Sequence, residues 1–288
     1  MIVMEPYRSR ERFSPQYDEI RRFLHLNADS GYNEHFPWGR LDWMMAHSML
    51  DAERLPKIAL FRDDGAALVG VALFDTAFQD RWYLLHTASD PSLLRRMVDY
   101  VLQADGDAAA IKCNQQDSAL RGLLEATGFE QDWSDHVLAL DLSRELRYRL
   151  PEGFRLTGPN EAVDSRQWRL VLHRGFENEG VPQEPGADIL AAERHQDVPG
   201  YIRVFAMKDE EYVAHCGVFY DGGTTAYIEP VATVPEHRRK GLGRAVIYEA
   251  VGRAKMLGAK RAIVLSTQEF YLRLGMSLSS VVTTWKKG

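Results

Sequence analysis

Residues 231–245 have the sequence VATVPEHRRKGLGRA, in which an apolar run ends at Pro235 and a basic turn leads into a predicted helix over 241–258. Glycine lets the backbone approach a bound group closely, and the free amides at a helix N-terminus attract anions. Four basic side chains surround the turn, namely Arg238, Arg239, Lys240 and Arg244. The segment therefore predicts a pyrophosphate site with Gly241 and Gly243 at its centre.

A predicted mixed sheet surrounds this segment. We expect strands at 154–156, 201–207, 212–220, 226–234, 261–265 and 281–286, and helices at 166–176 and 270–274. Tyr271 lies in the second of these helices, which Gly275 ends. Strands and helices in this order predict an α/β (α+β) domain with a mixed, mostly antiparallel twisted sheet flanked by helices.

The first half of the chain repeats this order. After helices and loops over 1–55, we expect strands at 57–61, 67–74, 81–86, 108–112 and 137–142, and helices at 92–103 and 120–127. Gly128-Phe129 and Gly275-Met276 occupy equivalent places, 147 residues apart. This internal duplication predicts two tandem domains, which we place at 1–145 and 151–288, with a charged linker at 143–153.

Length and composition agree with two soluble domains. At about 150 residues a domain, 288 residues suggest two, and 45% hydrophobic and 26% charged residues are ordinary values. The net charge of −6 combines −9 over 1–145 with +3 over 146–288. The acidic first half disfavours nucleic-acid binding by the whole chain, because phosphate attraction requires a basic face.

Cysteine usage and hydropathy indicate the compartment. There are two cysteines, which argues against a disulfide framework and fits a reducing environment. No apolar run is long enough to span a membrane, and the N-terminal residues lack the apolar stretch of a signal peptide. We therefore expect a cytoplasmic protein without a membrane partner.

Two other kinds of chemistry lack their motifs. The nine histidines form no His-Glu-x-x-His pattern and do not cluster with the cysteines, so we expect no metal. No Gly-x-Ser-x-Gly motif is present, which argues against a serine hydrolase.

The second half resembles the GCN5-related N-acetyltransferase (GNAT) family over roughly residues 154–288. VPEHRRKGLGRA matches that family's acetyl-CoA pyrophosphate loop, and the Tyr271 segment resembles its closing FY-x-x-x-GF motif, with Met276 in place of Phe. The first half resembles a degenerate copy, best matched over 120–129, LRGLLEATGF. The resemblance implies two tandem acyl-CoA N-acyltransferase-like domains and acetyl-CoA as acyl donor.

The resemblance also implies a role for individual residues. Tyr271 would protonate the departing thiolate, which suits a phenol because it stays protonated at neutral pH. The backbone of Val231, Ala232 and Thr233 would bind the pantetheine arm. The pyrophosphate would lie among Arg238, Arg239, Lys240, Gly241, Leu242, Gly243 and Arg244.

An amine acceptor requires a base, because an alkylammonium has no lone pair for attack. Glu229 is the predicted base, since side chains alternate with period two and place it on the strand face of Val231 and Thr233. Pro230 directly after it indicates a bulge or a strand edge at a cleft. His215, on the adjacent predicted strand, is the alternative base.

Two features depart from the family's pattern. STQEF, residues 266–270, is all that separates Leu265 from Tyr271, where the family has a longer loop with a cofactor-contacting Asn; Gln268 or Ser266 would replace it. The first half has no glycine loop and carries Asp90 where a phosphate would lie, so we expect no acetyl-CoA in 1–145.

The sequence thus predicts an N-acetyltransferase that transfers an acetyl group to a primary amine of a small molecule or a peptide. The loop carboxylates Glu177 and Glu179 are candidates for attracting a cationic amine. The alternatives are an inactive acyl-CoA sensor or interaction module, and an enzyme that uses a longer acyl-CoA. We expect a monomer, with a homodimer as the alternative.

Overall fold

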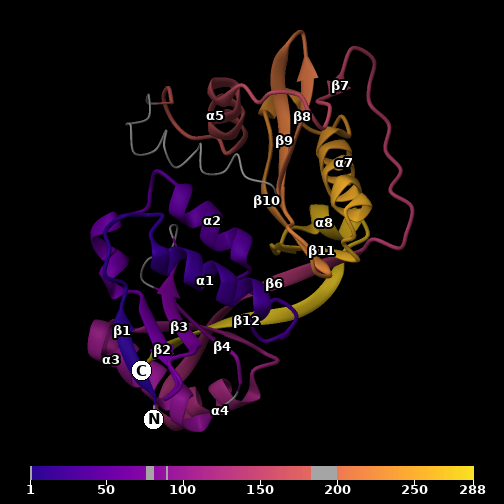
Figure 1. The fold of residues 1–288 in the computed structure, drawn as a ribbon. Coiled ribbons are helices and arrows are strands. Elements are labelled where there is room, and N and C mark those ends of the chain that lie inside the picture. The colour runs from indigo at the N-terminus through magenta and orange to yellow at the C-terminus, as the bar shows by residue number, and fades with distance from the viewer. Residues whose placement is uncertain (1, 76–80, 89, 183–199) are drawn as a thin grey trace.

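A computed structural model describes residues 2–75, 81–88, 90–182 and 200–288. Its strands form one mixed sheet in the order β1-β2-β3-β4-β5-β12-β6-β11-β10-β9-β8-β7. The two halves of the chain lie at opposite ends of this sheet, and β6 and β12 run between them (Figure 1). The fold class expected from the sequence, a mixed and mostly antiparallel sheet flanked by helices, is confirmed.

The first half supplies one end of the sheet and the helices on its two faces. Its strands are β1 (Val3–Pro6), β2 (Ala59–Arg62), β3 (Leu68–Phe74), β4 (Arg81–His86) and β5 (Ala110–Asn114). Its helices are α1 (Pro15–Leu26), α2 (Trp38–Ala46), α3 (Pro91–Asp105) and α4 (Ser118–Ala126), with 3₁₀ turns η1 (Ala52–Lys57) and η2 (Gly106–Ala108).

The second half supplies the other end. Its strands are β7 (Arg155–Leu156), β8 (Tyr201–Lys208), β9 (Glu211–Phe219), β10 (Thr225–Thr233) and β11 (Arg261–Leu265). Its helices are α5 (Ser165–Gly175), α7 (Leu242–Met256) and α8 (Glu269–Arg273), with the 3₁₀ turn η3 (Pro235–His237). Asp164 begins α5, because its side chain accepts bonds from the amides of Arg166 and Gln167.

The last strand of each half is exchanged between the halves. β6 (Phe129–Asp141) pairs with β11, and β12 (Ser277–Lys287) pairs with β5, while β6 and β12 also pair with each other. Trp285 of β12 is buried in the first half's core beside Phe129. Each half therefore completes its sheet with a strand of the other, and the domain ranges 1–145 and 151–288 stay a prediction.

Most expected elements are present within a few residues of their expected bounds, and two differ. β1 was not expected, because its four residues VMEP carry no alternating pattern, and β6 begins at Phe129 rather than near Val137. The early part of β6 has exposed polar residues, since it pairs with β12 along a strip that solvent reaches. The alternation of apolar and polar residues in the sequence therefore predicted only the buried, C-terminal part of β6.

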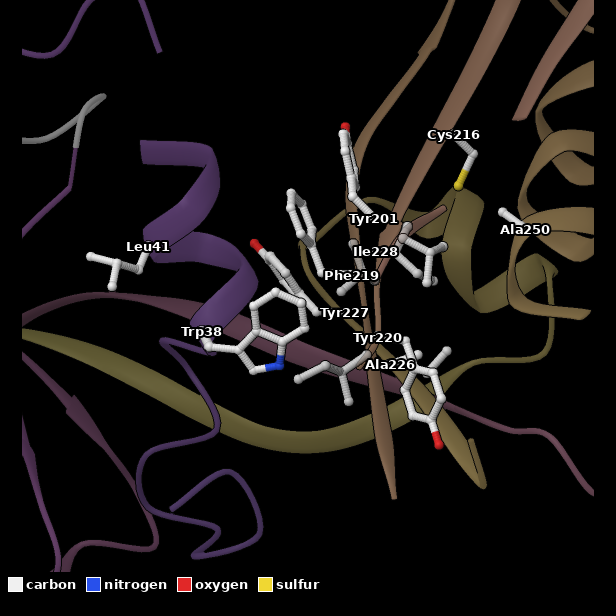
Figure 2. Close-up of a cluster of buried hydrophobic side chains, with 14 of the residues drawn as sticks. Trp38, Leu41, Tyr201, Cys216, Phe219, Tyr220, Ala226, Tyr227, Ile228 and Ala250 are labelled. Carbon is white, nitrogen blue, oxygen red and sulfur yellow. The ribbon is translucent and has the colours of Figure 1, made fainter. Parts of the chain in front are cut away.

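Helix α2 of the first half packs directly on the sheet of the second half. The rings of Trp38 and Phe219 meet edge to face, with 5.7 Å between their centroids. Tyr201, Phe219 and Tyr227 lie on the side of the sheet that faces α2, while Cys216 points toward Ala250 of α7 (Figure 2). Gly39 makes this approach possible, because a Cβ there would lie 2.4 Å from the Cβ of Phe219. One face of the second half's sheet is thus covered by a helix of the first half.

We expect Gly39→Ala to lower the free energy of unfolding by about 1–3 kcal/mol, because the added methyl overpacks α2 against β9. Urea unfolding measures the change. Gly122→Ala in α4 is the matched control, since no atom lies within 4 Å of its added Cβ. Equal stability changes in the two variants would contradict the tight contact at Gly39.

Candidate active site

A cleft of about 1060 Å³ opens in the second half, between the end of β10, the start of α7 and helix α8. It is lined by Tyr271, by Gln268 and by nine of the ten residues predicted to bind the donor: Val231, Ala232, Thr233, Arg238, Arg239, Gly241, Leu242, Gly243 and Arg244. Lys240 and Glu229 do not line it. The fold thus brings together most of the residues that the sequence singled out.

The cleft lies where two parallel strands separate. β10 pairs with β11 over Thr225–Tyr227, and β10 then continues to Thr233 without further pairing on that side. On its other side β10 remains paired with β9, where Val231, Ala232 and Thr233 lie opposite Cys216, His215 and Ala214. The edge of residues 231–233 toward β11 is therefore open to hydrogen bonding by an extended ligand.

The turn before α7 presents free backbone donors to the cleft. Gly241 is the N-cap of α7 with φ +86° and no side-chain cap, and the first helical amide with a backbone acceptor is Ala245 N, bonded to Gly241 O at 3.1 Å. Within the described residues, the amides of 239–244 form no hydrogen bond. An uncapped N-terminus with this many free amides suits a pyrophosphate.

A side chain at position 243 would crowd the ring of Phe270. A Cβ at this position would lie 3.1 Å from Cζ of Phe270, the residue before Tyr271. The glycine therefore lets Phe270 of α8 pack against the first turn of α7.

The guanidinium of Arg238 is held by hydrogen bonds within the protein, which connect the turn before α7 to the end of α5. Its Nε donates to Thr233 O at 3.0 Å, its Nη2 donates to Gly175 O at 2.8 Å, and its Nη1 bonds to Glu177. Glu177, predicted as an attractor of the amine, is thus the partner of Arg238. Glu179 is exposed and does not line the cleft.

The linker between the halves forms one wall of the cleft, which the sequence did not predict. Arg147, Tyr148 and Arg149 line it, and Tyr148 is fixed by donating to Glu249 Oε2 of α7 at 2.6 Å. Among the residues that the structure describes, none that lines the cleft carries a carboxylate. The charge of the linker was the only signal in the sequence, and no motif marks it.

We expect Arg147→Ala/Arg149→Ala to weaken acetyl-CoA binding about tenfold at low salt, because two charges beside phosphates contribute about 1.4 kcal/mol together. Calorimetric titration at low and high ionic strength measures the effect, which shrinks in salt. Arg22→Ala/Arg95→Ala, on exposed positions of the first half, is the control and should bind normally. Equal affinities in both double variants would exclude the linker from the donor site.

Tyr271 lines the cleft. Its side chain is largely buried, it lies in α8, and burial raises the pKa of its phenol. No hydrogen bond to its hydroxyl is found in the part of the chain that the structure describes. The group is therefore a protonated donor without a protein acceptor, and nearby Glu229 and Cys216 contribute to its raised pKa.

Glu229 lies at a β-bulge, as the following Pro230 indicated, but its predicted face is wrong. The register shifts between Ile228 and Val231, so that Tyr227 lies opposite Phe219 while Val231 lies opposite Cys216. Phe219 and Cys216 are on opposite faces of β9, as Figure 2 shows. The bulge therefore puts Glu229 on the face of Tyr227, not on that of Val231 and Thr233, because one extra residue breaks the alternation.

The carboxylate of Glu229 has two partners at the junction of the halves. Its Oε2 accepts from the hydroxyl of Tyr227 and from Nη1 of Arg40, which comes from α2 of the first half. Arg40 Nε also donates to Oδ2 of Asp75 at 2.9 Å. Burial opposes the charge of Arg40, but the carboxylates of Glu229 and Asp75 raise its pKa well above the ordinary value. Neither Arg40 nor Asp75 carried a signal in the sequence.

His215, the alternative base, is a buried core residue. Burial lowers its pKa to about 3, its ring stacks on Phe205 at 4.5 Å, and its Nδ1 lies 3.2 Å from Val204 O. Its Nε2 has no hydrogen-bond partner among the described residues. The ring faces Trp168 of α5, and it does not line the cleft.

The departures from the family's pattern have structural counterparts. Gln268 lines the cleft, and its backbone N–H donates to Ser266 Oγ at 3.1 Å. In the first half, Asp90 is the N-cap of α3 and accepts from Ser92 N at 2.8 Å. The helix end that would receive a phosphate is therefore already capped by a carboxylate.

Comparisons with known proteins agree with this geometry. Residues 166–276 match the model of the acetyltransferase (GNAT) family. A tandem GNAT protein from the clavulanic acid biosynthesis pathway has a similar structure, with a TM-score of 0.62, 14% identity, and coverage of 100% of this chain and 99% of its own. A GCN5-related N-acetyltransferase from Sphaerobacter thermophilus has a TM-score of 0.57 and 14% identity, covering 99% of this chain and 95% of its own.

A protein that is not named as a GNAT protein has a similar fold. The C-terminal domain of a putative lysylphosphatidylglycerol synthetase from Agrobacterium fabrum has a TM-score of 0.54 and 10% identity, covering 96% of this chain and 93% of that one. No curated protein matches the chain in sequence. Residues 166–276 thus match the GNAT family, and the fold of both halves together is similar to that of a tandem GNAT protein.

No helix in the described part of the chain is long and apolar enough to cross a membrane. No group of three or more His, Cys, Asp or Glu residues in the described ranges is placed to hold a metal ion.

Proposed function

We propose that the protein is an acetyl-CoA-dependent N-acetyltransferase that transfers an acetyl group to a primary amine in a ternary complex. The observation that carries the proposal is the uncapped N-terminus of α7 in a cleft whose described lining residues include basic side chains and no acidic ones. An acyltransferase family match over the same residues supports it. When bound, acetyl-CoA supplies the thioester whose acetyl group is transferred.

The residues of the cleft suit this donor from one end to the other. The amides of 239–244 and the side chains of Arg239 and Arg244 would hold the pyrophosphate. The open edge of residues 231–233 would bond the pantetheine arm in place of a neighbouring strand. This leaves the reacting end beside Tyr271 and the bulge of β10.

Two side chains would move the protons. Glu229 would accept a proton from the ammonium group of the acceptor, directly or through a water. Tyr271 would donate its phenolic proton to the departing sulfur, a role for which its raised pKa keeps it protonated. Most of the rate would come from holding amine and thioester together.

The first half would bind no donor, because Asp90 caps α3 where a phosphate would otherwise lie. The direct test is a calorimetric titration with acetyl-CoA, followed by thiol release with spermidine, an aminoglycoside, lysine and a peptide with a free N-terminus. One site per chain and release of CoA with an amine support the proposal. Binding without release points to a sensor module, and a second site would contradict our assignment of the first half.

Tyr271→Phe is expected to lower kcat about 10²-fold, because the ring stays in place and only the proton donor is lost. The acetyl-CoA dissociation constant should stay within about twofold of the original, a change worth less than about 0.5 kcal/mol. Phe270→Leu is a control for general disturbance of α8, since Phe270 packs on Gly243. An unchanged kcat in Tyr271→Phe would remove the phenol from the mechanism.

A further inference from the structure

Arg40 connects the first half to the predicted base of the second. It lies in α2, its side chain is mostly buried, and its guanidinium bonds to Asp75 on one side and to Glu229 on the other. Its Nη1 also lies 3.4 Å from the hydroxyl of Tyr227. These contacts join residues 189 positions apart in sequence.

The contacts to Glu229 fall on one oxygen. Arg40 and Tyr227 both bond to Oε2, and Oε1 forms no hydrogen bond within the described residues. Asp75, which is almost fully buried, fixes the guanidinium through Nε and Nη2. A planar guanidinium held in this way orients a carboxylate more narrowly than a flexible ammonium can.

The packing of α2 sets this orientation. Gly39, next to Arg40, lets the helix touch Phe219, and Trp38 packs on the same ring. The helix therefore cannot withdraw from β10 without losing the contacts that Figure 2 shows. The position of the guanidinium relative to the bulge is consequently a property of the joined halves.

We propose that the first half completes the catalytic site, with Arg40 as a positioning residue that holds Glu229 by Oε2 and leaves Oε1 to take the proton of the acceptor amine. The inference rests on the proposed function. It gives a role to the first half, which lacks the donor loop: the first half supplies Arg40, which holds the carboxylate of Glu229. A base held within a narrow range of orientations is needed for efficient proton transfer.

A double-mutant cycle separates positioning from packing. The variants are Arg40→Lys, Arg40→Met, Glu229→Gln and Arg40→Met/Glu229→Gln, with Arg22→Met on exposed α1 as control. Because Arg40→Met leaves Asp75 buried without this partner, Arg40→Met/Asp75→Asn serves as a second variant that removes both charges. Each is measured for thermal unfolding, for acetyl-CoA affinity, and for kcat with the most rapidly acetylated of the four amines named above.

We expect Arg40→Met and Arg40→Met/Asp75→Asn to lower kcat about 10²-fold, with acetyl-CoA affinity within about twofold and with Arg40→Lys between them and the original protein. In the Glu229→Gln background, Arg40→Met should cause no further fall in kcat, because the guanidinium of Arg40 then has no base to orient.

Three results would overturn the inference. An unchanged kcat in a folded Arg40→Met/Asp75→Asn protein, or an equal fall with and without Glu229, refutes positioning and leaves the proposed function standing. An original protein that binds acetyl-CoA but acetylates none of the four amines refutes the proposed function itself, and the inference with it.

Discussion

Glu229→Gln is expected to lower kcat about 10²- to 10⁴-fold, the range that a positioned general base contributes. Glutamine occupies the same volume and can still accept a hydrogen bond from Tyr227, but its amide cannot take a proton from the amine. Acetyl-CoA affinity should not change, because Glu229 does not line the donor cleft. Steady-state kinetics beside calorimetry separates the two effects.

Glu269→Gln is the matched control for this variant. Glu269 also belongs to an ion pair, with Arg273 at 2.8 Å, but both residues lie in α8 and their side chains are exposed. An exposed pair contributes about 0–1 kcal/mol, so kcat should stay near its original value. If Glu229→Gln matched this control, the proton would have to leave by another group or by solvent.

Gly241→Glu/Gly243→Glu is expected to abolish measurable acetyl-CoA binding, a loss of at least about 100-fold, or roughly 2.7 kcal/mol. Gly241 has φ +86°, which strains any residue with a side chain, and a side chain at 243 collides with Phe270. Two new carboxylates would also repel the pyrophosphate at the site where free amides attract it. Calorimetric titration gives both the affinity and the number of sites.

Gly122→Glu provides the comparison for the glycine variant. Gly122 lies in α4 of the first half, where no atom lies within 4 Å of an added Cβ. This protein should bind one acetyl-CoA per chain with its original affinity, and thermal unfolding should show that both variants are folded. Binding that survived in a folded Gly241→Glu/Gly243→Glu protein would place the donor elsewhere.

Most of the residues that line the cleft could be singled out from the sequence because the determinants of their placement are local. A helix N-terminus, the glycines before it and the strand that precedes it lie within residues 231–245, and their backbone geometry follows from residue types alone. Tyr271 joined this set through a second short motif. Both segments could be recognised because their local structure does not depend on contacts with residues far away in the sequence.

The parts that could not be predicted depend on distant contacts. Arg40 meets Glu229 because α2 packs across from the other half, and nothing near either residue records this. The face of Glu229 was wrong because the bulge inserts one residue whose effect on alternation depends on pairing with β9. The exchange of β6 and β12 likewise depends on long-range pairing, of β6 with β11 and of β12 with β5.

The exchanged strands also constrain how the protein can be made. β5 is paired with β4 and β12, and residues 277–287 of β12 are translated after every other strand that the structure describes. Until then the first half exposes the unpaired edge of β5, to which the strand of another nascent chain can add. The first half is synthesised before the second, yet its sheet is completed only after β12 has left the ribosome.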